Sequence, residues 1–212
     1  VWTRDELERL LELTRRYGVI LVSDEIHADF VFAGHRQTRI LSLPGTDHCV
    51  MLTSATKSFN LAGLRQSSCI VPNADLRQKV QAEIERAHAS TPNLFGAIAQ
   101  MTAYTHGDEW MDAVVEYIQE NRDYVVAYIR EHMPQIRVRP QEGTYLMWLD
   151  FSGLNRSHEE LISLLVNDAH VALNSGLDYG EEGALHFRLN LATPRCNVVQ
   201  VMENINTAIR GR

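Results

Sequence analysis

The chain has 212 residues, a formal net charge of −7 and a hydrophobic fraction of 45%. These values fit one large or two smaller globular domains and argue against intrinsic disorder. The negative charge argues against nucleic acid or an anionic membrane as the main partner, and no apolar run reaches the roughly 18 residues of a membrane span. Three well-separated cysteines without a CxxC pair favour reduced thiols in a cytoplasmic protein over a structural zinc site.

The first predicted element is a helix near the amino end of the chain. Thr3 and Glu6 have the spacing of a capping box, and Gly18 is placed to end the helix. The chain starts at Val1 without an initiator Met and enters this helix almost at once. An opening of this kind predicts a fragment of a longer protein.

Apolar runs then alternate with helical patterns over the first half of the chain. The run 19–22 is short, continuous and apolar, which is typical of a buried strand in a parallel sheet. Further strands are predicted at 50–53 and 68–71, and helices at 74–89 and 93–105. This order of elements predicts an α/β domain with a mostly parallel sheet.

A long helix is predicted from about Asp108 to His132, and Pro134 ends it. At about 1.5 Å per residue it would extend about 37 Å, a length that often bridges two lobes. Strands are then predicted at 136–139, 144–150, 171–174 and 186–192, and helices at 158–167 and 197–209. The chain is therefore expected to divide into an α/β part at 1–115 and a small α+β domain at 116–212.

Acids and a histidine follow the first predicted strand. Asp24, Glu25, His27 and Asp29 stand at its carboxyl end, where open α/β sheets build their sites. A solvated loop is one interpretation, and a metal site that uses His27 with Asp24 or Asp29 is another. No second histidine stands at helical spacing, so the sequence favours no metal site here.

Small hydroxyl residues surround a lysine at the end of the second predicted strand. Lys57 lies close to Ser54 and Thr56, and Arg65 follows. A polar turn with a solvated lysine is one interpretation. Alternatively, a lysine that loses hydration among small side chains is a competent amine nucleophile for a carbonyl. Hydroxyl donors and a guanidinium suit a phosphate, so the run indicates a phosphate-bearing aldehyde such as pyridoxal 5′-phosphate.

Several short motifs stand in a characteristic order along the chain. Ser23-Asp-Glu-Ile-His is followed by Ser54-x-x-Lys57 and Gly63-x-Arg65, and later by Gly143-Thr-Tyr and Phe187-Arg-Leu-Asn. In this order the motifs resemble the fold-type I, class I/II aminotransferase superfamily along essentially the whole chain. The strings DEIH and TKSFNLAGL are similar to its branch of cystathionine β-lyase-like C–S lyases, the MalY/PatB group.

The resemblance implies cofactor-binding roles for residues of the first half. Lys57 would hold pyridoxal 5′-phosphate through its amine and later move the Cα proton as a general base. Asp24 would pair with the pyridine nitrogen and keep the ring protonated, so that the ring can accept electrons. His27 would lie near the ring hydroxyl, where many relatives have Tyr. The phosphate would be bound by Ser54, Arg65 and, as a weaker candidate, Thr56.

The resemblance also implies substrate-binding residues near the end of the chain. Arg188 would bind the α-carboxylate of an amino acid in a bidentate pair. Phe187 and Leu189 alternate with Arg188 and Asn190, so Arg188 can face a polar cleft while its neighbours fill the core. Asn190 is expected to orient Arg188. Tyr145 would line the substrate pocket, although a packed strand aromatic is an equal interpretation.

Three functions remain open on these residues. The leading hypothesis is a pyridoxal-phosphate-dependent lyase that releases pyruvate, ammonia and a thiol from L-cystathionine or a cysteine conjugate, because His27 stands in the Asp-Glu-Ile-His context. An aminotransferase would use the same cofactor residues. A non-catalytic regulatory fragment that keeps the fold is the third hypothesis.

The family pattern includes features upstream of the first helix, namely a phosphate loop, an aromatic residue that stacks on the cofactor and an Asn beside the ring hydroxyl. Residues 1–115 would then be the second half of the cofactor-binding large domain. By itself the 212-residue chain is expected to be inactive. The full-length protein is expected to be a homodimer.

Overall fold

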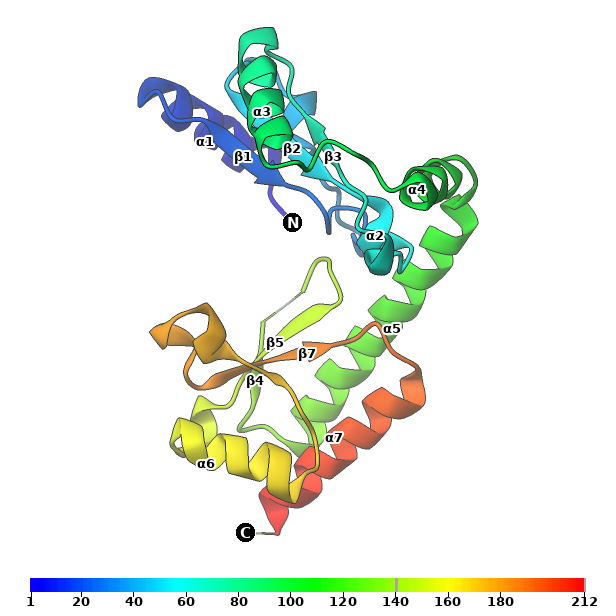
Figure 1. Cartoon of the computed structure of the whole chain (residues 1–212). Helices are drawn as coiled ribbons and strands as arrows, with labels where there is room; N and C mark the ends of the chain where they lie inside the picture. The colour runs from blue at the N-terminus through cyan, green and yellow to red at the C-terminus, as the bar shows by residue number, and fades with distance from the viewer. Residues whose placement is uncertain (140, 212) are drawn as a thin grey trace. The chain divides into compact units, whose positions relative to one another are not determined.

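The computed structural model describes residues 1–139 and 141–211. Contacts between residues divide the chain into two compact units, Val1–Val114 (unit 1) and Val115–Arg212 (unit 2). Each unit combines helices with its own β-sheet, which confirms the predicted α/β class (Figure 1).

The sheet of unit 1 has three short strands in the order β1-β2-β3. They are β1 (Leu21–Asp24), β2 (Cys49–Thr53) and β3 (Ser68–Ile70). β1 and β2 pair in parallel, as predicted, whereas β3 is antiparallel to β2. The antiparallel pairing arises because the connection 54–67 turns back at the carboxyl end of β2 and brings Ser68 opposite Thr53.

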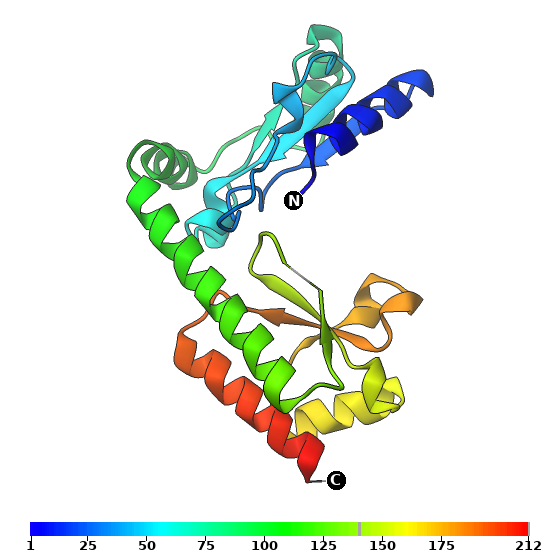
Figure 2. The same ribbon diagram turned by 180° about the vertical axis from the view of Figure 1, so that it is seen from behind.

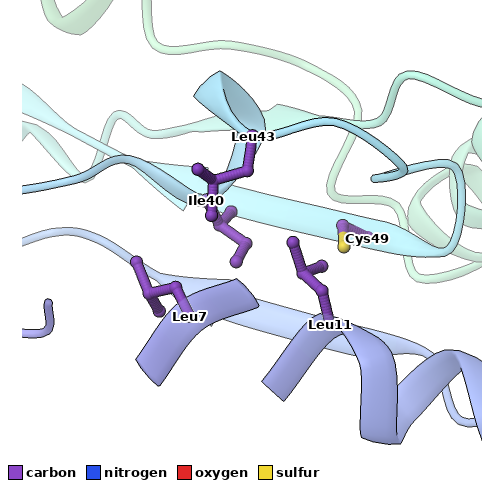
Figure 3. Packing of buried hydrophobic residues seen from close by; sticks show 5 residues of the cluster. All are labelled: Leu7, Leu11, Ile40, Leu43 and Cys49. Atoms are coloured by element: carbon purple, nitrogen blue, oxygen red, sulfur yellow. The ribbon is translucent and has the colours of Figure 1, made fainter. Parts of the chain in front are cut away.

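Helix α1 (Arg4–Arg16) covers one face of this sheet. It begins with the predicted capping box of Thr3 and Glu6, and Gly18 follows it with a φ of 64°, a conformation that favours glycine. Leu7 and Leu11 point from α1 toward the sheet (Figure 3). The cluster they complete also contains Ile40, Leu43 and Cys49.

The other face of β1 departs from the prediction of a buried strand at 19–22. The strand begins at Leu21, and the side chains of Val19, Ile20 and Val22 are 50%, 54% and 56% exposed. Leu21 packs against the α1 cluster, so Val22 lies on the opposite face because side chains alternate along a strand. Its neighbour on β2, Val50, is only 6% exposed, so the described residues cover this face over β2 but leave it open over β1.

Three further helices belong to unit 1. They are α2 (Ala55–Ser58), α3 (Ala74–Arg86) and α4 (Leu94–His106). Each is capped by a side chain that accepts backbone N–H groups, from Ser54, Asn73 and Asn93 respectively. An apolar stripe of α4 is exposed and consists of Leu94, Phe95, Ile98 and Met101.

Helix α5 (Asp108–His132) has the predicted bounds, and it begins in unit 1 and ends in unit 2. Its residues Ile118, Val125 and Ile129 are buried at helical spacing in the core of unit 2. Pro134 follows two residues after the helix ends, as the sequence predicted.

The sheet of unit 2 is antiparallel throughout and has the order β4-β5-β7-β6. Its strands are β4 (Arg137–Val138), β5 (Leu146–Asp150), β6 (Asn174–Ser175) and β7 (His186–Asn190). Leu149 and Phe187 are paired neighbours on the buried face, and Trp148 and Arg188 are paired neighbours on the opposite face. The predicted strand at 171–174 is shorter than expected and begins only at Asn174.

Helices α6 (His158–Ser163) and α7 (Arg195–Arg210) complete unit 2. Ser157 forms a capping box with Glu160, and α6 continues as a π-helical turn over Leu164–Asp168. α7 runs beside the second half of α5 (Figure 2). No helix within the described ranges combines the length and the apolar character that a bilayer crossing needs.

Candidate functional site

The carboxyl ends of β1 and β2 meet at one edge of the unit 1 sheet. The two strands are parallel, and Asp24 at the end of β1 is aligned with Leu52. The side chain of Asp24 is exposed, and its Oδ1 accepts a hydrogen bond of 3.2 Å from the backbone N of Ile26. The connection that follows β2 therefore starts beside Asp24. Its first element carries Lys57.

Lys57 lies on α2, the single helical turn that follows β2 directly. Its neighbours Thr56 and Ser58 are 8% and 3% exposed, whereas Lys57 itself is exposed. Within residues 1–139 and 141–211, its amine has no hydrogen-bond or ion-pair partner. The turn thus buries the residues on both sides of Lys57 and presents the amine outward.

The two predicted phosphate-binding hydroxyls are buried. Ser54 is 1% exposed, and its Oγ accepts from the backbone N of Thr56 at 3.0 Å. The same Oγ lies 2.5 Å from the backbone O of Gln66 and 2.8 Å from Thr56 Oγ1, and its single proton can be donated to one of them. The hydroxyls therefore brace α2 against the segment that leads into β3.

Arg65 lies on this same connection between β2 and β3. It has a left-handed backbone with φ 51° and ψ 39°, an uncommon conformation for a residue with a side chain. Its guanidinium is exposed and, in the described part of the chain, has no acidic or hydrogen-bonding partner. Two cationic side chains, Lys57 and Arg65, thus lie on one short connection without a partner in the described part of the chain.

His27 occupies the turn that follows β1. Its backbone O accepts from Phe30 N at 3.1 Å, and the two rings are tilted by 43° with centroids 6.3 Å apart. The imidazole is partly buried. No group of three or more His, Cys, Asp or Glu side chains in the described residues is arranged to hold a metal ion.

In unit 2, Arg188 lies on the β7 face that is turned away from the core. Its Nη2 donates to Asn174 Oδ1 at 3.3 Å, and its Cζ lies 5.0 Å from the centre of the Tyr179 ring. Its Nε is buried and has no hydrogen-bond partner among the described residues. Buried donors nearly always have a partner, so this guanidinium is incompletely satisfied and suited to an anion.

The sequence identified Arg188 but missed the residues that hold it. Asn174 is opposite Arg188 in the β6–β7 register, and Tyr179 packs its ring against both the guanidinium and Trp148. The strand pairing that would have revealed Asn174 is a long-range feature. Asn190, the predicted orienting residue, instead accepts a hydrogen bond from the backbone N of Ala192 at 2.9 Å.

The loop that carries Tyr179 is closed at its base by two glycines. A Cβ atom on Gly176 would collide with the backbone O of Gly183, and a Cβ on Gly183 would collide with the backbone of Gly176. This backbone-to-backbone contact requires glycine at both positions. At the same loop base, Ser175 Oγ accepts a hydrogen bond of 3.2 Å from the backbone N of Leu177.

A groove of about 480 Å³ lies beside Arg188 and is also lined by Asn174 and Asn190. Tyr145 precedes β5 and is partly buried. Burial raises the pKa of its phenol above the ordinary value, while the positive charge of Arg188 opposes that rise. The charge of Arg188 therefore acts on the phenol of Tyr145.

Residues 1–205 match the family model for class I and II aminotransferases. The chain therefore belongs to this family, and the resemblance found in its motifs is confirmed. Among curated relatives, it is 33% identical over 98% of its length to cystathionine β-lyase PatB of Bacillus subtilis (strain 168). It is also 34% identical over its whole length to the MalY protein of Escherichia coli (strain K12).

Solved structures agree with the family assignment. Cystalysin from Treponema denticola, whose crystal contains pyridoxal 5′-phosphate, matches the whole chain with a TM-score of 0.95 at 28% identity, and the match covers 54% of that protein. The match to PatB likewise covers 54% of PatB. The chain thus spans about half the length of the relatives it matches.

Proposed function

We propose that the protein containing this chain is a pyridoxal-phosphate-dependent C–S β-lyase of the cystathionine β-lyase type. The observation that carries the proposal is Lys57, an amine with no partner among the described residues, on the turn after β2 at the sheet edge where Asp24 ends β1. The similarity to PatB and to other curated cystathionine β-lyases supports the choice of reaction. L-Cystathionine or a cysteine conjugate would be the substrate.

The donor set of unit 1 fits an aldehyde that carries a phosphate and a basic ring nitrogen. Lys57 offers the amine, Asp24 a carboxylate for the ring nitrogen and Arg65 a cation for the phosphate. His27 would approach the ring hydroxyl. Ser54 and Thr56 would complete the phosphate site, and Ser54 would then donate its proton to the phosphate in place of Gln66 O.

When bound, pyridoxal 5′-phosphate supplies an electron sink for the electron pair left at the substrate Cα. Arg188 would bind the substrate α-carboxylate, and Asn190 lines the groove beside it. Tyr145 would line the substrate pocket. Lys57 would remove the Cα proton, after which the thiolate leaves from Cβ. Water then converts the remaining three-carbon amino acid fragment to pyruvate and ammonia, which balances the reaction.

The activity is proposed for the complete protein, because the chain spans about half the length of its relatives. Residues 1–115 would form half of the cofactor-binding domain, and 116–212 the small domain. The 212-residue chain alone is expected to be inactive. The complete protein is proposed to be a cytoplasmic homodimer, and the exposed apolar stripe of α4 supports the presence of a further protein surface.

The test is pyruvate release from L-cystathionine by the complete protein supplied with pyridoxal 5′-phosphate. Release in the wild type and its loss in Lys57→Ala, together with loss of the visible absorbance of the bound cofactor, is the expected result. Amino transfer to a 2-oxo acid without pyruvate release would instead favour an aminotransferase, which the family model also describes. Absence of cofactor absorbance in the wild type would favour a non-catalytic protein.

A further inference from the structure

Three charged side chains near the proposed cofactor residues form a continuous network that the proposed chemistry does not use. Arg39 donates from Nη1 to Glu25 Oε2 at 3.2 Å and from Nη2 to Asp29 Oδ1 at 2.5 Å. The Glu25 side chain is only 4% exposed, and that of Asp29 is 20% exposed. Buried carboxylates are stable only when paired, so Arg39 ties together two points of the turn after β1.

The network reaches α2 through the second oxygen of Asp29. Ser58 Oγ donates to Asp29 Oδ2 at 2.5 Å, and Ser58 is 3% exposed. Ser58 directly follows Lys57 on the same helical turn. Asp29 therefore joins the segment that follows Asp24 to the segment that carries Lys57, the two sides of the proposed cofactor site.

The other end of the network is anchored in the core of unit 1. Glu25 Oε1 accepts from the backbone N of Ile40 at 2.9 Å, and Ile40 is 1% exposed. Ser23 Oγ donates to the same oxygen at 3.2 Å. Glu25 is thus fully satisfied and holds Arg39 in a fixed place relative to β1 and the α1 cluster.

Helix α2 needs such an anchor because it is only four residues long. A single turn has too few backbone hydrogen bonds to be stable by itself, so its orientation depends on tertiary contacts. Besides Asp29, these contacts include the Ser54 cap and a hydrogen bond of 3.3 Å from Trp110 Nε1 to the backbone O of Ser58. Among them, only the Asp29 contact links α2 to the segment after Asp24.

We propose that Asp29, held by Arg39 and bonded to Ser58, is a positioning residue that fixes the turn carrying Lys57 relative to Asp24. This inference rests on the proposed function, because it assigns a purpose to that placement. Proton transfer is sensitive to displacements of about 1 Å, which can cost up to about a hundredfold in rate. Loss of the contact should therefore reduce turnover more than it reduces substrate affinity.

The experiment compares Ser58→Ala with Ser42→Ala in the complete protein. Both variants remove one serine hydroxyl, but Ser42 Oγ donates to the backbone O of Arg39 at 2.7 Å, and no hydrogen bond within the described residues joins it to α2. We expect Ser58→Ala to lower kcat for pyruvate release about tenfold with KM changed less than twofold. Ser42→Ala should match the wild type in both constants.

The second readout does not depend on turnover. Titration of each apoprotein with pyridoxal 5′-phosphate, followed by its visible absorbance, should show about tenfold weaker binding for Ser58→Ala and no change for Ser42→Ala. If Ser58→Ala does not fold, Asp29→Asn serves in its place, because it keeps the shape but removes the charge that Arg39 and Ser58 contact. It should also lower kcat and cofactor affinity.

The outcomes separate this inference from the proposed function. A wild type that binds the cofactor but releases no pyruvate rejects the lyase, while the cofactor titration still tests Asp29. An active wild type whose Ser58→Ala variant keeps wild-type kcat and cofactor affinity rejects the positioning role of Asp29. Equal losses in Ser58→Ala and Ser42→Ala would also reject it, since they would show a general destabilisation.

Discussion

The two units of the chain bury their apolar side chains to different extents. Among the described residues, ten apolar residues are buried in unit 1 and twenty in the shorter unit 2. Unit 1 instead exposes apolar side chains on its sheet, including Val22 and Ile70, and along α4. Since apolar burial is the main stabilising term in folding, unit 2 should be the more stable of the two.

The candidate binding residues of the two units differ in whether neighbouring side chains already hold them. Arg188 in unit 2 is already held by Asn174 and Tyr179, whereas Lys57 and Arg65 in unit 1 have no side-chain partner among the residues described. A preorganised guanidinium suits a substrate that binds and leaves in each turnover. Unpartnered cations suit a cofactor that remains bound and supplies the missing charge.

Truncation of one buried leucine in each unit should give the two most different losses of stability. Leu149→Ala in unit 2 should cost about 4 kcal/mol and Leu11→Ala in unit 1 about 2 kcal/mol, because Leu149 is enclosed on all sides and Leu11 borders a more open unit. Native-state hydrogen exchange of β5 and β7 amides, compared with β1 and β2 amides, measures each loss separately. Equal losses in the two units would show that their cores are equally well packed.

A smaller effect is expected for the buried amide of Asn121. This side chain is 0% exposed, donates to Leu191 O and Thr193 O at 2.8 and 3.0 Å, and accepts from Arg195 Nε at 2.5 Å. Asn121→Ala leaves these groups without partners and should destabilise unit 2 by about 3 kcal/mol. Urea denaturation measures the loss.

The control for Asn121 is Gln200→Ala on α7, whose exposed side chain hydrogen-bonds, within the described residues, to Asn204 alone. Its free energy of unfolding should change by less than about 0.5 kcal/mol. A similar loss in both variants would show that the Asn121 bonds contribute little to the closure of unit 2.

Two capping boxes allow a matched test at about 1 kcal/mol, since Thr3 caps α1 in unit 1 and Ser157 caps α6 in unit 2. Thr3→Ala and Ser157→Ala should cost about the same at the helix itself. Hydrogen exchange should show that the Thr3 loss spreads to β1 and β2, because α1 covers that sheet, whereas the Ser157 loss stays within α6. If the loss of protection spread beyond the helix in both units, or in neither, the two units would not differ in how their cores are packed.

The smallest expected effect concerns Tyr179. Removing its ring should raise the KM for L-cystathionine about two- to fivefold with kcat unchanged, because an exposed cation–π contact contributes little. Tyr179→Leu is the test variant and Tyr179→Phe, which keeps the ring, should stay close to the wild type. Steady-state kinetics of the complete protein measure this KM. An unchanged KM in Tyr179→Leu would show that Asn174 alone holds Arg188.

Much of the fold could be predicted because its signals are local. The capping boxes of Thr3 and Ser157 and the length of α5 follow from residue types at fixed spacings. The antiparallel direction of β3 and the short β6 could not be predicted, because both depend on pairing between distant segments. The exposure of Val22 was missed because an apolar run does not reveal what covers it.

The candidate site residues could be named from the sequence, but the side chains that support them could not. Lys57, Asp24 and Arg188 stand in motifs that a sequence displays directly. Asp29 and Arg39 form part of the network that holds α2 only because the turn after β1 folds back upon η1, the 3₁₀ turn Ile40–Ser42. These partners meet only in the folded chain. The sequence alone therefore could not distinguish the acids of this network from those of a solvated loop.

The contact between Gly176 and Gly183 has a consequence for variation among related chains. Because a backbone contact closes the loop base and β5 pairs with β7 along its length, the side chains of Leu177 to Tyr179 and of Glu181 and Glu182 take no part in the pairing that sets the β7 register. Substitutions in this stretch can therefore change what lies above Arg188 while the strand that carries it stays in place. Natural selection, or a randomised library, can therefore alter substrate selectivity at this stretch without unfolding the sheet that carries Arg188.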